Sequence, residues 1–578
     1  MTAFDLVVRN GTVLDGSGGP PLQADIGVTG GVIAAVAPGL AAGVEEIDAS
    51  GLLVTPGFVD IHTHYDGQVT WSERLSPSSS HGVTTVLMGN CGVGFAPCRP
   101  SDREMLIQVM EGVEDIPELV MAKGIPWAWE SFAEYLDFLD GRSYDIDIAT
   151  QVPHAAVRVN VMGQRGADRE PATAEELERM TAIVAEGVRA GALGVSSARS
   201  LAHRFKDGRP VPHIGAAEEE LKALARGLRD AGAGVFQMLS KYQDPADFGP
   251  TRSEAEEVGL MREIVETSGR PLSFTLQDAA HVPGAWRKML DLVEDANRQG
   301  FPIKAQVFPR PVGMLFGIEL SMNPFSLNPS YAAIANLPHA EKVAKLREPE
   351  LKKRLLAEEP GGDNPVSIFI LRMLDNMYVL GDPPIYEPSA DQSLGARAAR
   401  AGVSSRELAY ELMLEQEGKT ILFLPIVNFV DATLDAVDVM IRHPDVLVSL
   451  GDGGAHYGMV CDSSYPTFML THWVRDRVSG PRISLPEAVH GLTRKTALAV
   501  GLTDRGLLAP GMKADINVID HDRLYLPAPY VVYDLPSGGK RLTQDAEGYV
   551  ATIVSGQCIA RGGRPTGALP GKLVRGSR

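Results

Sequence analysis

Short apolar runs typical of β-strands alternate with amphipathic helical patterns over most of this chain, and this alternation limits the fold more than any other feature. In one clear unit, Thr173-Ala174-Glu175-Glu176 has the capping-box pattern of a helix start, Gly191 marks the expected end, and a strand is expected over 192–197. In another, a helix is expected to begin at Ser404 and to lead into an apolar strand at 421–426. Repeated strand–helix units predict a parallel sheet.

Eight such strand ends are expected, which predicts an α/β fold with a (β/α)8 TIM-like barrel. The expected ends lie in residues 59–62, 85–88, 148–152, 193–196, 235–238, 272–275, 421–426 and 446–450. In such a barrel the reactive residues gather at the carboxyl ends of the strands.

Both ends of the chain have a different pattern, with short strands between glycine-rich turns. Strands are expected at 5–9, 12–14, 24–28, 32–36, 516–519, 550–554 and 557–560. We therefore predict that residues 1–55 and 506–578 form the two parts of a small β-sandwich, the second with a C-terminal tail. The barrel is expected over 56–505, with an inserted subdomain at about 310–403, where Pro-, Asn- and Arg-rich sequence interrupts the alternation. We expect this insertion to cover the barrel mouth.

Two histidines, His62 and His64, follow the first expected barrel strand. Residues i and i+2 of a strand point to the same face, so the two imidazoles should lie side by side at the strand's end. Such a pair is half of a divalent metal site. A pair of buried structural histidines is the alternative, and we favour the metal site.

Asp452 follows the last expected strand, in Gly451-Asp452-Gly453-Gly454. A closed barrel places its last strand beside its first. A carboxylate there can bind the metal and accept a proton from water, although an aspartate among glycines is also common in turns. Beside His62 and His64, we favour the catalytic and metal-binding role.

Cys91 lies in Gly89-Asn90-Cys91-Gly92, after the second expected strand. A thiolate is a good zinc ligand, and the glycines would let the backbone approach a metal site. The alternative is a small buried cysteine that serves only packing.

These motifs resemble the amidohydrolase superfamily, and within it the D-aminoacylase (N-acyl-D-amino-acid deacylase) group, over nearly the whole chain. The resemblance is carried by Pro56 to His64, Gly89 to Gly92, Gly191 to Ser196 and Pro510 to Asp515. It implies that His62, His64 and Asp452 bind one metal and that Cys91 matches the cysteine ligand of another.

The chain departs from this family pattern at three places. The expected fifth and sixth strands lack the metal-binding histidines of the family, and Cys461-Asp462-Ser463-Ser464-Tyr465-Pro466 stands where the group has His-Pro-Arg. The second metal and the N-acyl-D-amino-acid substrate therefore stay open. Additional metal or substrate contacts are considered for His281, His456, Arg199 and Arg310, and with less weight for His154, His203 and His213.

Composition excludes several other classes of protein. The formal net charge of −19 argues against a nucleic-acid partner. No segment reaches the ~18–20 uncharged apolar residues of a membrane span, and no signal peptide is evident. The four cysteines are too scattered for a disulfide framework, which fits a reducing cytoplasm.

We therefore predict a cytoplasmic, metal-dependent hydrolase of a C–N amide bond other than a peptide bond, with a divalent metal, zinc foremost, and Asp452 as general base and acid. An N-acyl (D-)amino acid is the first substrate considered. A cyclic amide or imide is the alternative substrate, and a degenerate amidohydrolase that only binds a ligand is the alternative function. The partner is a small-molecule amide, and a homo-oligomer is compatible with the sequence.

Overall fold

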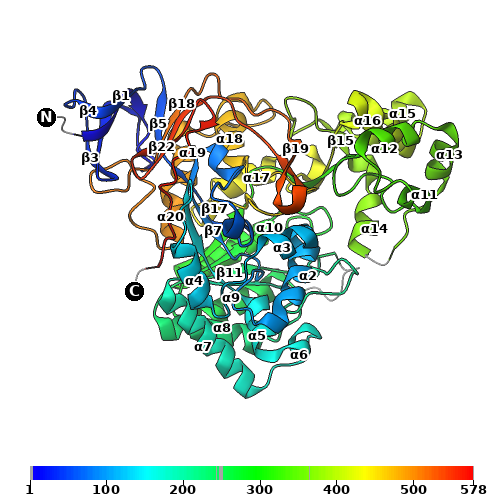
Figure 1. Ribbon diagram of the computed structural model, residues 1–578, viewed down its shortest axis with the longest axis horizontal. Coiled ribbons are helices and arrows are strands. Elements are labelled where there is room, and N and C mark those ends of the chain that lie inside the picture. Colours follow the sequence, from blue (N-terminus) through cyan, green and yellow to red (C-terminus); the bar gives the residue numbers. More distant parts are fainter. Residues whose placement is uncertain (1–3, 243, 246–251, 363–364, 577–578) are drawn as a thin grey trace.

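The fold was analysed in a computed structural model, which describes residues 4–242, 244–245, 252–362 and 365–576. It is a mixed α/β protein with parallel strands at its centre (Figure 1). A sheet built from both ends of the chain lies at one end of the molecule, and helices α11–α16 lie at the other (Figure 1).

The central strands form two parallel runs that follow each other in sequence. The first run contains β6 (Phe58–Asp60), β7 (Val83–Met88) and β8 (Asp147–Thr150). The second contains β9 (Val152–Pro153), β10 (Gly194–Ala198), β11 (Val235–Leu239), β12 (Leu272–Thr275), β13 (Ile303–Val307) and β17 (Val446–Val448). Only Gln151 separates the two runs in sequence, and Leu193 N donates to Thr150 O between them at 2.9 Å. This strand order is consistent with the expected (β/α)8 barrel.

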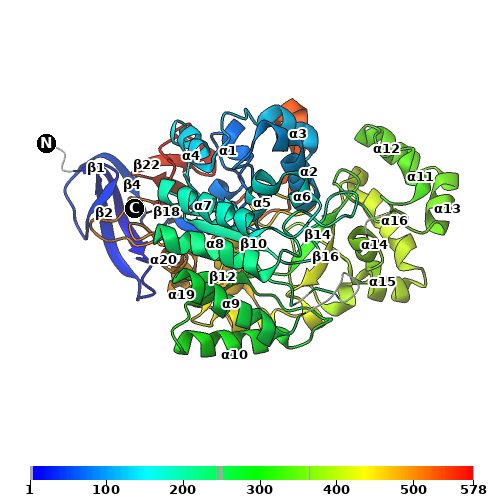
Figure 2. The same cartoon turned by 90° about the horizontal axis from the view of Figure 1, so that it is seen from below.

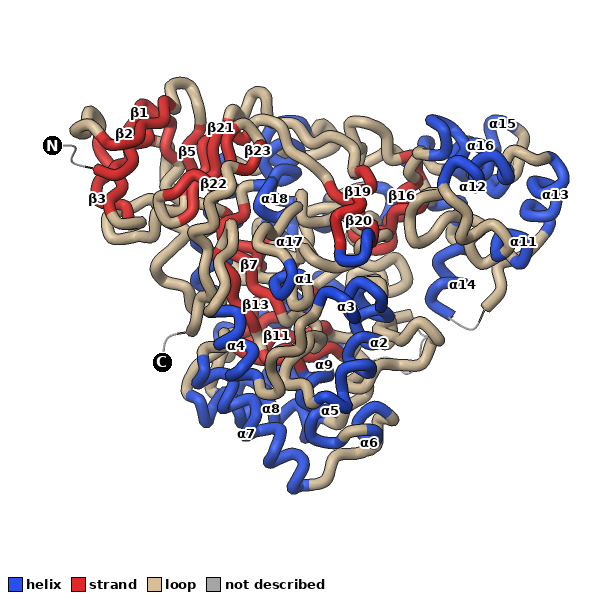
Figure 3. The backbone as a smooth tube through the Cα atoms, viewed as in Figure 1, coloured by secondary structure: helices blue, strands red, loops and turns tan. Residues whose placement is uncertain are grey.

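Helices cover the parallel strands, which explains why nearly all residues of these strands are buried, the polar ones included. Helices α7, α8, α9 and α10 pack side by side in a row (Figure 2). Helix α7 begins at Ala174, within the expected capping box formed by Thr173 and Glu176, and Gly191 follows its end. The strands lie at the centre of the molecule with helices around them (Figure 3). The helices of this region are α1 (Gln68–Trp71), α2 (Arg103–Glu114), α3 (Glu118–Gly124), α4 (Phe132–Asp140), α5 (His154–Met162), α6 (Gln164–Ala167), α7 (Ala174–Ala190), α8 (Glu218–Ala231), α9 (Glu254–Ser268), α10 (Ala285–Arg298), α17 (Asp435–Ile441), α18 (Tyr465–Phe468), α19 (Leu485–Leu492) and α20 (Arg494–Ala499).

The prediction that 421–426 is the seventh parallel strand is wrong. The strand between β12 and β17 is β13, whereas β16 (Leu422–Val427) runs antiparallel to β14 (Val312–Phe316) and β15 (Tyr378–Val379). Strand β13 has polar residues at Lys304 and Gln306, whereas β16 has no polar side chain in Leu422–Val427. The apolar run of β16 instead packs in a separate core of the inserted region.

The inserted region contains this small antiparallel sheet and a group of helices. Its helices are α11 (Pro329–Ala332), α12 (His339–Leu346), α13 (Pro349–Ala357), α14 (Pro365–Leu371), α15 (Leu394–Ala401) and α16 (Ser405–Gly418). Helices α11–α13 share a core with Tyr410 and Met413 of α16. These helices therefore form a unit of their own beside the parallel strands (Figure 1).

Strands from both chain ends form one connected nine-stranded sheet, where a two-part sandwich was expected. It contains β1 (Phe4–Val13), β2 (Leu22–Thr29), β3 (Val32–Ala37), β4 (Gly43–Asp48), β5 (Leu53–Pro56), β18 (Ile516–Ile519), β21 (Tyr549–Val554), β22 (Gln557–Arg561) and β23 (Arg564–Pro565). The sheet curls, because Ile33 N in β3 donates to Met512 O, in the segment that leads into β18. Apolar residues of both chain ends thereby share one core. A separate hairpin pairs β19 (Tyr530–Leu535) with β20 (Gly539–Thr543).

Among the described residues, no helix has both the length and the apolar character needed to cross a membrane.

Candidate active site

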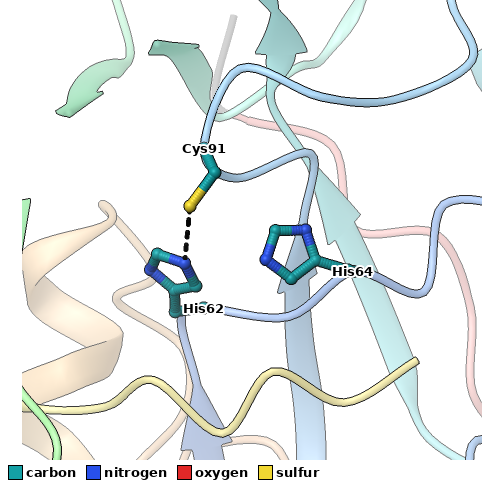
Figure 4. A group of neighbouring side chains, drawn as sticks. All are labelled: His62, His64 and Cys91. Atoms are coloured by element: carbon teal, nitrogen blue, oxygen red, sulfur yellow. Dashed lines mark hydrogen bonds between the residues drawn. The ribbon is translucent and has the colours of Figure 1, made fainter. Parts of the chain in front are cut away.

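His62 and His64 lie directly after β6, at its carboxyl end, as predicted. Both side chains are buried, and their ring centroids are 5.5 Å apart. Cys91, on the loop after β7, points toward His62, with Sγ 3.3 Å from Nε2 (Figure 4). One donor atom from each of these three residues lies within 4.8 Å of the other two.

Asp452 completes this cluster from the loop after β17. Its Oδ1 lies 3.7 Å from Nε2 of both His62 and His64. Asp452 has a φ of 46°, in the left-handed region that non-glycine residues rarely adopt. The flanking glycines are required by packing, because a Cβ at Gly451 would lie 2.2 Å from Asp60 Oδ2 and one at Gly453 would lie 2.6 Å from Ser78 Oγ.

The partners of the other ring nitrogens indicate the tautomers of the two histidines. His62 Nδ1 lies 2.8 Å from Gln306 Oε1, a carbonyl oxygen that accepts the Nδ1 proton, and Gln306 Nε2 donates to Ser273 Oγ at 2.9 Å. Burial lowers the pKa of His62 to about 4, which keeps the ring neutral. His64 Nδ1 faces Glu114 Oε1 at 3.4 Å. His62 Nε2 thus faces the cluster as an electron-pair donor. The approach of Glu114 favours the same tautomer for His64, although this contact does not have hydrogen-bond geometry.

The donor set fits a divalent metal ion. Two imidazole nitrogens, a sulfur and a carboxylate oxygen are the ligand types of zinc. Burial and nearby carboxylates raise the pKa of Cys91 well above its usual range, and burial and Glu114 do the same for Asp452. A bound cation would offset this unfavourable burial of anionic groups.

The sequence reasoning missed Glu114, the last residue of α2. Glu114 is 2% exposed; its Oε2 lies 3.4 Å from His456 Nε2, and burial raises its pKa to about 8. A signal was available, because Glu114 follows Ile107 and Met110 at the spacing of the apolar face of the helix. A glutamate at such a position is buried in the core, where it needs polar partners.

The cluster opens into a cavity of about 210 Å³. Its lining combines histidines, carboxylates and apolar side chains: His62, His64, Cys91, Val113, Glu114, His203, Leu239, Thr275, Gln277, Val312, Leu450, Asp452, His456 and Asp462. His456, considered from the sequence, therefore does reach the cavity.

The other sequence candidates lie elsewhere. The suggestion of His281 as a ligand is not supported, because it is exposed on the loop between β12 and α10 and does not line the cavity. Arg199 is directed at the buried Glu257 of α9, with Nε 3.5 Å from Oε1.

Arg310 is fully buried and engaged behind the cavity wall. Its Nη2 donates to Asp462 Oδ1 at 2.6 Å and to the Cys461 carbonyl oxygen at 2.7 Å, and its Nη1 donates to Ser464 Oγ at 3.0 Å. The guanidinium also stacks 3.9 Å from the ring centre of Tyr386. Both Nη atoms thus donate to the protein, and only Nε lacks a partner among the described residues. With Arg310 fully buried and absent from the cavity lining, this arrangement argues against the predicted substrate contact.

Of the three histidines given less weight, His203 and His213 lie close to the cluster. His203 lines the cavity, and His213 Nε2 lies 3.2 Å from the Cys91 carbonyl oxygen. His154 instead contacts Ser197 and Glu220, each at 2.8 Å, which gives it a structural role.

The strands that lack the family's histidines carry uncharged polar residues. Gln237 of β11 accepts a hydrogen bond from Cys91 N at 2.9 Å through Oε1. On β12, Ser273 accepts from Gln306, and Thr275 lines the cavity. Among the described residues, this wall therefore supplies hydrogen-bonding groups where histidines were expected.

Comparison with known proteins gives a consistent family assignment. Residues 45–560 match the sequence profile described as "Amidohydrolase family". N-acyl-D-aspartate deacylase from Alcaligenes xylosoxydans xylosoxydans is 27% identical, with 99% of this chain and 95% of the relative covered. D-aminoacylase from the same organism is 35% identical over 34% of this chain and 37% of its own length.

Solved structures show the same fold. A D-aminoacylase described as having a binuclear metal centre aligns over 99% of this chain and 100% of its own, with 23% identity and a TM-score of 0.66. N-acyl-D-glutamate deacylase from Bordetella bronchiseptica, solved with zinc and a phosphonate inhibitor, aligns over 99% of both chains, with 22% identity and a TM-score of 0.66.

Proposed function

This chain belongs to the amidohydrolase family and is an enzyme acting on carbon–nitrogen bonds other than peptide bonds, and on that premise we propose that it hydrolyses an amide at the His62–His64–Asp452 cluster. The observation that carries the proposal is the approach of Asp452 Oδ1 to within 3.7 Å of both histidine Nε2 atoms. This approach brings the carboxylate that follows the last parallel strand to the two histidines that follow the first.

We place the cluster at the carboxyl end of a (β/α)8 barrel spanning residues 56–505. Its insertion runs from about 310 to 427, beyond the expected 403, because it includes α16 and β16, and the curled sheet built from both chain ends (1–55 and 506–578) takes the place of the sandwich. The segments after the first and last parallel strands support this closure. Asp452 N donates to His62 O at 3.1 Å, and His64 N donates to Gly453 O at 2.7 Å. Gly451 and Gly453 flank Asp452, and neither position has space for a side chain.

His62, His64, Asp452 and Cys91 would hold one divalent ion, with zinc the first choice for this donor set. Such an ion supplies Lewis acidity, which polarises a carbonyl group and lowers the pKa of water. The neutral histidines leave the negative charge of the site on Asp452 and the thiolate of Cys91.

Asp452 acts as the general base and then as the general acid. Its carboxylate accepts a proton from the attacking water as the new C–O bond forms. The same group then delivers that proton to the amide nitrogen as the C–N bond breaks, so the products are a carboxylic acid and an amine. The cavity of about 210 Å³ beside Asp452 gives room for the amide group next to this carboxylate.

An N-acyl-D-amino acid is the first substrate class to test, since curated relatives are named D-aminoacylase and N-acyl-D-aspartate deacylase. One observation favours the second candidate, a cyclic amide or imide. The described residues that line the cavity include Glu114, Asp452 and Asp462 but no lysine or arginine. Arg310 is buried behind Asp462, to which its Nη2 donates, and it does not line the cavity, so a free substrate carboxylate has no cationic partner in this lining.

The test combines metal analysis with Asp452→Asn. Protein that is expressed in the cytoplasm and purified without added metal should contain close to one divalent ion per chain. Asp452→Asn keeps the size of the side chain but removes its charge, so kcat should fall by at least the ~10²–10⁴ typical of a general acid–base group. Asp445→Asn, just before the other end of β17, is the matched control and should keep wild-type kcat.

Activity would be measured on N-acetyl-D-amino acids, their uncharged carboxamides and cyclic imides. Full activity without bound metal, or wild-type kcat in Asp452→Asn, would contradict the mechanism. A metal-loaded protein that turns over none of these amides would favour the degenerate, ligand-binding alternative.

A further inference from the structure

Glu114 is a buried carboxylate to which the proposed hydrolysis gives no role. It ends α2, the helix between β7 and β8, on the face formed by Leu106, Ile107 and Met110. The side chain is only 2% exposed, and a carboxylate removed from water in this way is unfavourable unless hydrogen-bonding partners surround it.

The partners of Glu114 are two histidines of the active site. Oε1 lies 3.4 Å from His64 Nδ1, and Oε2 lies 3.4 Å from His456 Nε2. The backbone adds a third contact, because the Glu114 carbonyl oxygen accepts a hydrogen bond from His456 N. Glu114 therefore spans the space between a histidine that follows the first parallel strand and one that follows the last.

The contact with His64 is placed where it can orient a metal ligand. His64 Nε2 faces Asp452 Oδ1 at 3.7 Å, and the other ring nitrogen faces Glu114. A metal-binding histidine commonly donates its second N–H to a carboxylate or carbonyl oxygen, which fixes the ring and increases its basicity. His62 has such a partner in the neutral Gln306, whereas His64 has a carboxylate.

We propose that Glu114 is a positioning residue of the metal site, which holds His64 with Nε2 directed at the ion and fixes His456 on the cavity wall. This inference rests on the proposed metal site at His62, His64 and Asp452. It also gives a reason for the glutamate on the apolar face of α2, because Glu114 Oε1 lies 3.4 Å from His64 Nδ1, a buried ring nitrogen that makes no hydrogen bond among the described residues.

The neighbouring Asp115 provides a matched control. Asp115 Oδ2 accepts hydrogen bonds from Gly458 N at 3.0 Å and from Ser321 Oγ at 2.8 Å, and no contact joins it to His64. Asp115 thus secures the end of α2 to the loop beyond Asp452 and to the inserted region. Loss of Asp115 tests the placement of the helix, whereas loss of Glu114 tests the contact with the histidines.

The experiment measures zinc affinity of the full-length protein by competition with a chromophoric chelator. Glu114→Ala should weaken zinc binding by about 10–100-fold, the usual effect of losing a carboxylate that orients a metal-binding histidine. Glu114→Gln keeps the shape and one acceptor oxygen, so its loss should be smaller than that of Glu114→Ala. Asp115→Asn should bind zinc as the wild type does. After substitution with cobalt, the visible absorption spectra of the Glu114 variants should differ from that of the wild type. The spectrum of Asp115→Asn should match the wild type.

Each other outcome has a definite meaning. Wild-type zinc affinity in both Glu114 variants, with thermal unfolding showing that they are folded, would overturn the inference. An equal loss of affinity in Asp115→Asn would overturn it too, because the effect would then come from docking of α2. If the wild type binds no zinc, this inference and the proposed function fail together. If it binds zinc but hydrolyses no amide, only the proposed function fails, and the affinities still decide the role of Glu114.

Discussion

At the scale of single residues, the site depends on backbone conformations that are costly for ordinary side chains. Cys91 has a φ of 55°, between two glycines, Gly89 and Gly92, with φ values of 78° and 74°. A non-glycine residue in this region costs roughly 1–2 kcal/mol. Contacts on both sides hold the Cys91 backbone, since its N–H donates to Gln237 and its carbonyl oxygen faces His213. The result is a thiol directed at His62 Nε2, 3.3 Å away.

This arrangement predicts that Cys91 is a ligand rather than a packing residue. Cys91→Ser should weaken zinc binding by more than the ~10–100-fold expected for a residue that only orients a ligand. Cys98→Ser is the control, because Cys98 is equally buried but its Sγ contacts only the Arg99 carbonyl oxygen among the described residues. Zinc affinity of both variants is measured by chelator competition. An unchanged affinity in Cys91→Ser would make Cys91 a packing residue beside a site of two histidines and Asp452.

The sequence predicts the candidate site to the extent that its residues have a short-range pattern. His62 and His64 are two residues apart after an apolar strand, and Asp452 stands among glycines after another. Glu114 and Gln306 have no such pattern, because their roles depend on contacts with His64 and His62 that only the folded chain creates. For Arg310 the sequence pattern was misleading. Its position near a strand end suggested substrate binding, but in the folded chain its guanidinium is paired with Asp462.

At the scale of elements, the same limit explains the wrong seventh strand. The pattern of β16 is more apolar than that of β13, and hydrophobic pattern alone does not distinguish a central parallel strand from one in a satellite sheet. The polar Gln306 in β13 is explained by its bond to His62. Helix α7 was predicted correctly because its capping box and final glycine are local signals.

The inserted region reaches the cavity through Val312, at the start of β14. Val312→Ala should enlarge the cavity there and shift kcat/KM toward substrates with a bulkier acyl group, by roughly tenfold. Metal content should stay the same, because the apolar Val312 offers no ligand atom. Met314→Ala, two residues further along the same strand, does not line the cavity and serves as the control. Preference is measured over an acyl-length series, and an unchanged ratio would contradict a role of the insertion in substrate choice.

At the scale of the whole molecule, the chain's last described segment ties together parts that are distant in sequence. Gly571 pairs with Tyr144, and Leu573 forms a parallel bridge with Ile148 in β8. Val574 N donates to Ile148 O at 2.7 Å, and Gly576 N donates to Gly191 O at 2.9 Å. This segment therefore extends the hydrogen bonding of the parallel strands on the side away from the metal site, which no sequence pattern predicted.

This segment contributes to packing and not to the site. Weakening its packing should therefore lower the stability of the fold and leave metal binding unchanged. Leu573 is 8% exposed and belongs to the main hydrophobic core. Leu573→Ala removes this contact and leaves space behind, at a cost of about 2–4 kcal/mol, so the apparent Tm should fall by a few degrees. Leu119→Ala, at a residue that is 58% exposed, is the control and should leave Tm unchanged. Tm is measured by scanning fluorimetry and zinc content by elemental analysis at 25 °C. Zinc content should match the wild type in both variants. A loss of zinc in Leu573→Ala would show that the two ends of the parallel strands are coupled. An unchanged Tm in Leu573→Ala would show that the segment does not stabilise the fold.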